Sequence, residues 1–238
     1  MKDYADFDLA KLTETAMRER AELLSSHVRQ TPSVAFTSPR IDPLLGGGEL
    51  VLKLEQLQVT GTFKARGALS VALEIPLADR PKGITAASAG NHAIAAAWAA
   101  GHIGVSAKVV MISTANPFRV ERAKMLGAEV VIVEGGGAAM AAAQRLSEEG
   151  GRTYIHPFEG PYTTLGAAGV GLEMADQIGT LEAGKFDLND SYVLALRDLS
   201  NPIYRYKDPF GKAGAGAPVR DRQGNSVVTR MPQEEQQF

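Results

Sequence analysis

The stretch GITAASAGNHAIAAAWAAGHIGVSAKVVMI, residues 83–112, decides the fold class of this chain. An apolar run at 83–87 precedes an alanine-rich helical segment at 91–100, and a second apolar run follows at 107–112. The chain then continues with a helical segment at 117–126, an apolar run at 128–133 and a helical segment at 138–149. Strands that alternate with helices of this length predict βαβ units and a parallel sheet. The sequence therefore predicts an α/β protein with helices on the faces of its sheet.

Three glycines punctuate this alternation. Gly101, Gly127 and Gly150 fall where the three helical segments should end. A glycine directly after a helix adopts the left-handed backbone conformation more easily than other residues do. We expect these three glycines to end their helices.

Weaker signals extend the pattern in both directions. Apolar residues at helical spacing near the N-terminus predict an amphipathic helix, and the other segments follow from their apolar runs and from proline and glycine breaks. The expected elements are a helix at 8–27, a strand at 49–55, a helix from Lys64 to about Glu74, a short strand and turn at 153–158, a helix at 163–178 and an apolar run at 192–196. Residues 202–238 are rich in proline, glycine and polar side chains, so we expect mostly loop or disorder there.

The composition excludes several functional classes. The chain has 238 residues, of which 45% are hydrophobic and 22% charged, with a net charge of −2. The sequence has no basic stripe with interleaved aromatic residues, so it does not predict nucleic-acid binding. It also has no long apolar segment of the kind that predicts a membrane span or a signal peptide. Because cysteine is absent, disulfides and thiolate metal sites are excluded, which favours a reducing, cytoplasmic location.

A single lysine stands at the expected start of a helix in TGTFKARGA, residues 60–68. Lysine on a first helical turn usually faces water, since lysine is rarely buried without a partner. The alternative is a nucleophile, because an amine whose pKa is lowered by burial can attack a carbonyl. Lys64 alone does not decide between the two.

The turn SAGNHA, residues 88–93, joins an expected strand to an expected helix. Backbone N–H groups at the start of a helix attract anions such as a carboxylate or a phosphate. Ser88 and Asn91 have a simpler interpretation as capping residues. Both interpretations stay open on this motif alone.

Several motifs in order resemble the fold-type II pyridoxal-phosphate enzymes, closest to the serine/threonine dehydratase (threonine ammonia-lyase) and serine racemase group. The matching segments are TPSVAF, LVLKLEQLQVTGTFKARGA, SAGNHA, NPFRVERAKMLGAEVV, YIHPFEGP and GVGLE, which together cover approximately residues 21–178. The resemblance implies a two-lobed architecture similar to tryptophan synthase β, with the large lobe incomplete. The implied parts are 1–78 and 158–200 in the large lobe, 79–157 as a small α/β lobe, and 201–238 as a divergent tail.

The resemblance also implies the roles of individual residues. Lys64 is similar to the Schiff-base lysine, Phe63 to the residue packed against the cofactor ring, and Asn91 to the donor that reaches the cofactor's 3′-oxygen. The loop that grips the substrate carboxylate corresponds to Ser88, Ala89, Gly90, Asn91 and His92. The implied cofactor is pyridoxal 5′-phosphate, and no residue is implied as a metal ligand.

Ala89 narrows the implied reaction. A hydroxyl residue at this place is associated in the family with racemisation, and alanine has no proton to exchange. The resemblance therefore implies β-elimination from a hydroxy amino acid such as serine or threonine, giving a keto acid and ammonia, with Lys64 as the base at Cα. Relatives are commonly dimers, so a homo-oligomer is implied as well.

Four further residues invite simpler interpretations. His156 is expected to be structural, His27 to interact with a helix dipole, and Trp98 to pack in the core or an interface. Glu173 matches a family position, with a solvated or capping role as its alternative.

One expected motif is missing. The family places a glycine-rich phosphate loop after a strand in its second half, but Arg197, Asp198 and Leu199 follow the apolar run at 192–196. The sequence therefore leaves open a truncated, non-catalytic relative that acts as a binding or interaction protein. A nucleotide-binding module that uses residues 88–92 as its phosphate loop is a third alternative, although neither common nucleotide-binding glycine motif occurs.

Overall fold

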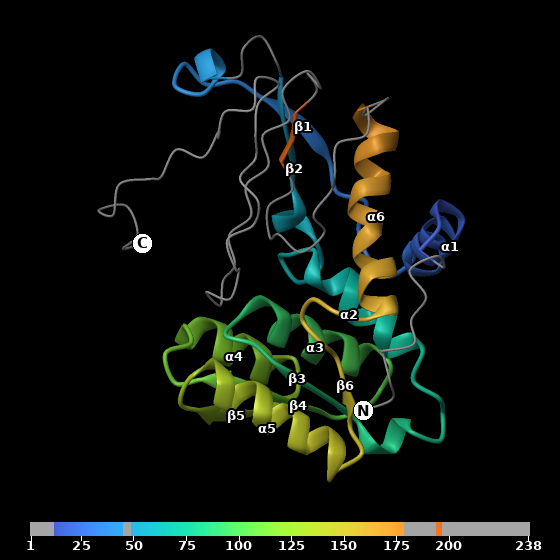
Figure 1. Ribbon diagram of the computed structural model, residues 1–238, viewed down its shortest axis with the longest axis vertical. Coiled ribbons are helices and arrows are strands. Elements are labelled where there is room, and N and C mark those ends of the chain that lie inside the picture. Colours follow the sequence, from blue (N-terminus) through green and yellow to red (C-terminus); the bar gives the residue numbers. More distant parts are fainter. Residues whose placement is uncertain (1–11, 45–48, 179–193, 197–238) are drawn as a thin grey trace, which may run out of the picture.

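The computed structural model describes residues 12–44, 49–178 and 194–196 (Figure 1). The elements, in chain order, are α1 Glu14–Leu24, β1 Ser33–Phe36, η3 Asp42–Leu44, β2 Leu50–Lys53, η4 Glu55–Leu57, α2 Lys64–Leu73, η5 Arg80–Lys82, β3 Ile84–Ala87, α3 Asn91–His102, β4 Ala107–Ile112, α4 Pro117–Met125, β5 Ala128–Val133, α5 Gly136–Glu148, β6 Thr153–Tyr154, α6 Pro161–Ile178 and β7 Leu194–Leu196. The predicted tail at 202–238 lies outside the described residues.

A four-stranded parallel sheet with the order β5-β4-β3-β6 forms the lower part of the molecule in Figure 1. Along β4, Val109 and Met111 pack with α3, whereas Val110 packs with Ala139 and Ala143 of α5. Side chains on a strand alternate between its two faces, so helices α3 and α5 cover opposite faces of the sheet. The predicted α/β fold is confirmed.

Alanine lets α3 lie close to its neighbours. Its six alanines, at positions 93, 95, 96, 97, 99 and 100, are almost fully buried, and Ala86 of β3 lies in the same core cluster. Small side chains keep the helix close to the sheet, and helix α2 packs on its other side, as the shared core cluster shows. This packing holds the start of α3 in a fixed place relative to the start of α2.

The predicted helix ends need two corrections. Gly127 has a φ of 87° and ends α4 as expected, but Gly101 lies inside α3 and Gly150 has no positive φ. Gly104, with a φ of 72°, and Gly151, with a φ of 63°, adopt the left-handed conformation instead. In these two helices the left-handed glycine therefore comes later than predicted, after Ile103 in α3 and after Gly150 in α5.

A second, antiparallel sheet has the order β1-β2-β7. Strand β2 occupies the middle of the predicted strand at 49–55, and β7 occupies part of the apolar run at 192–196. Helix α6 runs beside this sheet and beside α1 and α2 (Figure 1). The predicted helix at 8–27 is shorter than expected at its C-terminal end, since α1 stops at Leu24. Within the described ranges, none of the helices is both long and apolar enough to cross a bilayer.

Helices α2 and α6 touch through glycine. A Cβ atom added at Gly166 would lie 2.5 Å from the backbone oxygen of Arg66 and 2.6 Å from the Cβ of Ser70. Atoms do not approach this closely, so a side chain here would push the two helices apart. The close contact fixes the distance between α6 and the helix that begins at Lys64.

We expect Gly166→Ala to lower the free energy of unfolding by about 1–3 kcal/mol, the usual cost of overpacking a filled interior. Gly171→Ala is the matched control on the same helix, because a Cβ atom there meets nothing within 4 Å. That control should gain about 0.5–1 kcal/mol from reduced chain entropy. Urea unfolding of both variants measures the difference, and equal effects would contradict a close α2–α6 contact.

Candidate functional site

Lys64 is the first residue of α2, and its amine is withdrawn from water. The Nζ atom donates a hydrogen bond to the backbone oxygen of Pro157 at 2.7 Å. It also lies 4.6 Å from the ring centroids of both Phe63 and Phe158. Burial lowers the pKa of Lys64 to about 8, because the charged ammonium loses hydration. A substantial fraction of this amine is therefore neutral near pH 8, unlike an ordinary lysine.

The carbonyl that faces Lys64 belongs to the connection between β6 and α6. His92, the second residue of α3, bonds through Nε2 to the backbone oxygen of Ile155 at 2.8 Å. His156 Nδ1 accepts hydrogen bonds from the N–H groups of Phe158 at 3.2 Å and Glu159 at 2.8 Å. These bonds fix the connection on both sides of Pro157. The structural role predicted for His156 is consistent with this turn.

Both histidines are neutral at physiological pH. Burial, with smaller contributions from the nearby charges of Lys64 and His156, lowers the pKa of His92 to about 3, although the hydrogen bond to Ile155 acts in the opposite direction. Burial also lowers the pKa of His156, although Glu159 acts in the opposite direction. Since His92 Nε2 faces a carbonyl oxygen, it carries the proton and donates the bond. The surroundings of Lys64 thus add no positive charge at neutral pH.

We expect His92 to make the protein sensitive to acid. Between pH 6.5 and 3 the unfolded chain binds a proton at this residue and the folded chain does not. Stability should therefore fall as the pH drops through this range, with a slope contribution approaching about 1.4 kcal/mol per pH unit. Urea unfolding from pH 7 to 4 should show a shallower slope for His92→Gln than for the original chain. Parallel profiles would exclude this assignment.

The SAGNHA motif forms the predicted turn between β3 and α3. The Ser88 hydroxyl accepts a hydrogen bond from the Gly90 N–H at 3.0 Å, and α3 begins at Asn91 with no side-chain cap. The N–H groups of a first helical turn lack partners within the helix. A Cβ atom added at Gly90 would lie 2.3 Å from Arg119 Nη1, so the Arg119 guanidinium lies against the turn. The N–H groups at the start of α3 and the guanidinium of Arg119 together suit an anion.

The structure connects this turn to Lys64 through His92. His92 follows the turn and bonds Ile155, and Lys64 bonds Pro157 two residues further along. Phe63 is buried against Ala167, Val170 and Met174 and turns its ring toward the Lys64 amine. The roles of these residues in binding stay predictions.

Other residues near the site were not predicted. Pro157 and Phe158 contact the Lys64 amine. On the same helix, Arg66 pairs with Glu55 and Glu173, and Lys53 also pairs with Glu173. The solvated alternative for Glu173 does not hold, since its carboxylate binds two cations. An arginine in the otherwise apolar segment 65–73 was the available signal, because a buried arginine requires an acidic partner.

The remaining predicted residues have local roles. His27 packs edge-on against His102, with ring centroids 4.6 Å apart, and Trp98 packs against the core and the same histidine. In the part of the chain that the structure describes, no group of three or more His, Cys, Asp or Glu side chains is placed to bind a metal.

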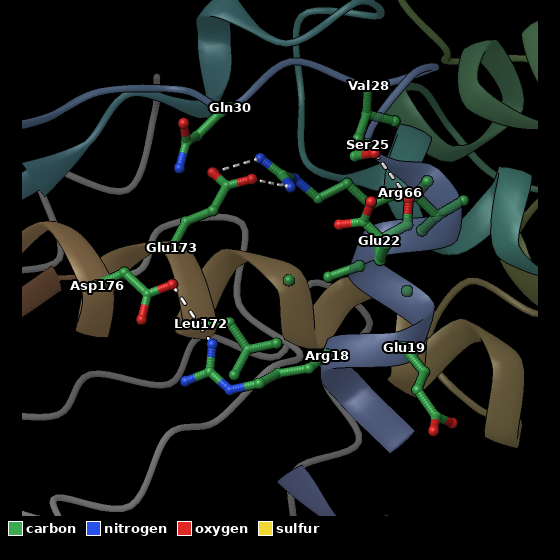
Figure 2. A pocket seen from close by; sticks show the side chains of 14 residues that line it. Arg18, Glu19, Glu22, Ser25, Val28, Gln30, Arg66, Leu172, Glu173 and Asp176 are labelled. Carbon is green, nitrogen blue, oxygen red and sulfur yellow. Dashed lines mark hydrogen bonds and ion pairs between the residues drawn. The ribbon is translucent and has the colours of Figure 1, made fainter. Parts of the chain in front are cut away.

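A pocket of about 860 Å³ lies between α1 and α6, and Lys64 does not line it (Figure 2). Arg66 and Glu173 contribute to it, and Arg18 and Asp176 form an ion pair at its edge. It is therefore separate from the Lys64 site, although it reaches the ion pairs behind that site.

The fold and the site define an α/β protein in which the desolvated Lys64 amine lies close to the turn that begins α3. The chain belongs to the family of pyridoxal-phosphate-dependent enzymes, whose profile matches residues 24–195. Pyridoxal phosphate is the cofactor of this family, as the sequence predicted. The site fits this cofactor, because the cofactor's aldehyde reacts with a neutral amine and the lowered pKa of Lys64 makes its amine neutral near pH 8.

Named relatives agree with this family. The chain is 46% identical over 160 residues to the phenylserine dehydratase of Ralstonia pickettii, covering 67% of this chain and 48% of the relative. It is 35% identical over 173 residues to the L-threonine ammonia-lyase of Thermotoga maritima, covering 72% and 42%. The chain thus spans about half the length of the curated relatives it matches.

Solved structures show the same fold. Maize serine racemase matches with a TM-score of 0.64 and 31% identity, covering 71% of this chain and 50% of that one. The processed form of threonine deaminase isoform 2 from Solanum lycopersicum matches with a TM-score of 0.62 and 27% identity, covering 73% and 50%. The fold-type II architecture predicted from the sequence is confirmed for the matched part.

Proposed function

We propose that this chain carries the lysine site of a β-eliminating enzyme that acts on hydroxy amino acids. The observation that carries the proposal is the Lys64 amine, which is desolvated and bonded to the Pro157 oxygen at 2.7 Å. The names of the relatives support the reaction class, since they include a phenylserine dehydratase and an L-threonine ammonia-lyase. The products would be a keto acid and ammonia.

Lys64, Phe63 and Asn91 are the residues that would hold pyridoxal phosphate. The cofactor, when bound, supplies an aldehyde and a ring that withdraws electrons from the substrate Cα. The expected phosphate-binding segment follows β7 and lies outside the described residues. The lobe division at residues 79 and 157 is part of the same proposal.

The chain's own residues would then bind and deprotonate the substrate. The first N–H groups of α3 and the nearby Arg119 would hold the substrate carboxylate at residues 88–92. Lys64, neutral near pH 8, would accept the proton from Cα, and the Pro157 oxygen would then hold the resulting ammonium. Ala89 has no proton to deliver to the opposite face of Cα, so elimination is favoured over racemisation.

The test begins with pyridoxal phosphate and the purified chain. A visible absorption band that disappears on borohydride treatment, with the label on the Lys64 peptide, would support the proposal. Release of keto acid and ammonia from phenylserine, threonine and serine would then identify the substrate. A protein that stays colourless with the cofactor would overturn the proposal.

The non-catalytic alternative has one specific observation in its favour. Arg197, Asp198 and Leu199 follow β7 where the family has its glycine-rich loop. Under this alternative the chain acts as a binding or interaction protein. Cofactor capture at Lys64 without release of any keto acid would favour it.

A further inference from the structure

Four charged side chains meet where β2, α2 and α6 come together. Arg66, in the first turn of α2, donates to Glu55 at 2.9 and 3.0 Å and to Glu173 at 2.6 and 2.9 Å. Lys53, on β2, donates to Glu173 at 2.7 Å. Figure 2 shows the guanidinium of Arg66 facing the carboxylate of Glu173 from the opposite helix. We call Lys53, Glu55, Arg66 and Glu173 the charge cluster.

The charge cluster is balanced and buried. It holds two cations and two carboxylates, and the side chains of Lys53 and Arg66 are 0% and 3% exposed. Backbone oxygens of Thr31 and Arg29 accept further bonds from the two cations. Burying four charges costs desolvation free energy that ion pairs often fail to recover. Stability alone is therefore a weak reason for this arrangement, and a positional role is the stronger one.

The charge cluster ties together the two helices on which the Lys64 contact depends. Lys64 lies two residues before Arg66 on α2, and its acceptor Pro157 lies four residues before α6 begins at Pro161. A displacement of α2 along α6 would therefore separate the amine from its carbonyl.

Glycines form the closest approach between the two helices, and Phe63 packs against α6 beside them. Gly67 and Gly166 lie at the contact, and their added Cβ atoms would strike Thr163 and the Arg66 backbone respectively. Small residues allow close approach but interlock weakly along the helix axis. The two parallel bonds between Arg66 and Glu173 are directional, so they define how α2 sits on α6.

We propose that Glu173 is a positioning residue for Lys64, which pairs with Arg66 and Lys53 so that the amine stays against the Pro157 carbonyl and out of water. This role would keep Lys64 fixed for the proposed reaction, so its purpose rests on the proposed function. The test uses the cofactor-free chain, so the positioning role of Glu173 and the proposed function can fail separately.

When Glu173 is made neutral, a change of local charge and a release of the amine into water shift the pKa of Lys64 in opposite directions. An uncompensated cation in the charge cluster would lower the pKa of Lys64 by repulsion. Release of the amine into water would raise that pKa from about 8 toward the ordinary 10.5. The other titratable groups that face Lys64 are His92 and His156, and both are held neutral by burial. The direction of the change therefore separates the two effects.

The experiment compares Glu173→Gln with Asp176→Asn. Asp176 is a half-exposed carboxylate one turn further along α6, so its variant is a matched control. Reductive methylation of Lys64 with formaldehyde, followed by peptide mass mapping across pH 6 to 11, gives the titration midpoint of the amine. We expect the midpoint to rise by roughly one pH unit or more in Glu173→Gln, since hydration of the ammonium returns, and to stay unchanged in the control.

A second variant protects the test against misfolding. Lys53→Met combined with Glu173→Gln removes one charge of each sign and leaves the Arg66–Glu55 pair in place. The same rise is expected for this double variant. A midpoint that stays near 8, or falls, in either variant with a circular dichroism spectrum like that of the original chain would overturn the proposal. Failure to bind pyridoxal phosphate would count against the proposed function alone.

Discussion

Lys64→Ala is expected to abolish the covalent capture of pyridoxal phosphate and to reduce elimination activity by at least about 10²–10⁴-fold, the usual contribution of a positioned base. The amine is both the group that reacts with the aldehyde and the proposed acceptor of the Cα proton. Its low pKa is the physical basis, because the neutral form exists at a pH where other lysines are charged. Borohydride labelling and release of keto acid measure the two losses.

Two controls sharpen this result. Lys124→Ala removes a half-exposed lysine that pairs with Glu121 on α4, and it should change neither measurement. Lys64→Arg keeps a cation beside Pro157 but cannot become neutral, so it should also fail to capture the cofactor. In the original chain the rate of capture should rise through about pH 8. Equal labelling of the Lys64→Ala variant would place the reactive amine elsewhere.

The parallel sheet could be predicted because its information is local. Each strand and helix of residues 83–149 is a short run with its own periodicity, and the observed bounds of β4 and β5 coincide with the predicted apolar runs. The glycine positions were harder to predict. Gly101 and Gly104 lie within one turn of each other, and the point at which α3 ends, His102, decides which of them adopts the left-handed conformation. The sequence contains both glycines, but it does not show which of them follows the end of the helix.

The antiparallel sheet and the burial of Lys64 depend on contacts between segments that are distant in the sequence. Strand β7 pairs with β2 across more than a hundred residues, and Pro157 reaches Lys64 from a separation of 93. Motif resemblance could identify Lys64 as a candidate, but its burial comes from Phe158 and Pro157, which carry no local sign of that role. Glu173 shows the same limit, since its two cationic partners come from β2 and α2.

Arg66→Met should be among the most destabilising substitutions in the described part of the chain, at about 3–5 kcal/mol. The long apolar side chain of methionine preserves much of the packing, so the loss comes from charge. Glu173 would keep its pair with Lys53, whereas Glu55 would lose its paired cation, and breaking a buried pair leaves an uncompensated charge. Urea unfolding at pH 7 measures the loss.

Acid should reduce this penalty, which identifies its electrostatic origin. In the Arg66→Met protein the two buried carboxylates repel each other, so the folded state should bind a proton more readily than the unfolded chain does. The stability difference from the original chain should therefore narrow as the pH falls from 7 to 5. Arg18→Met is the matched control, because Arg18 pairs with Glu14 and Asp176 at the surface, where water already compensates the charges. It should leave the unfolding curve unchanged, and an equal loss in both variants would mean that burial gives the charge cluster no special role.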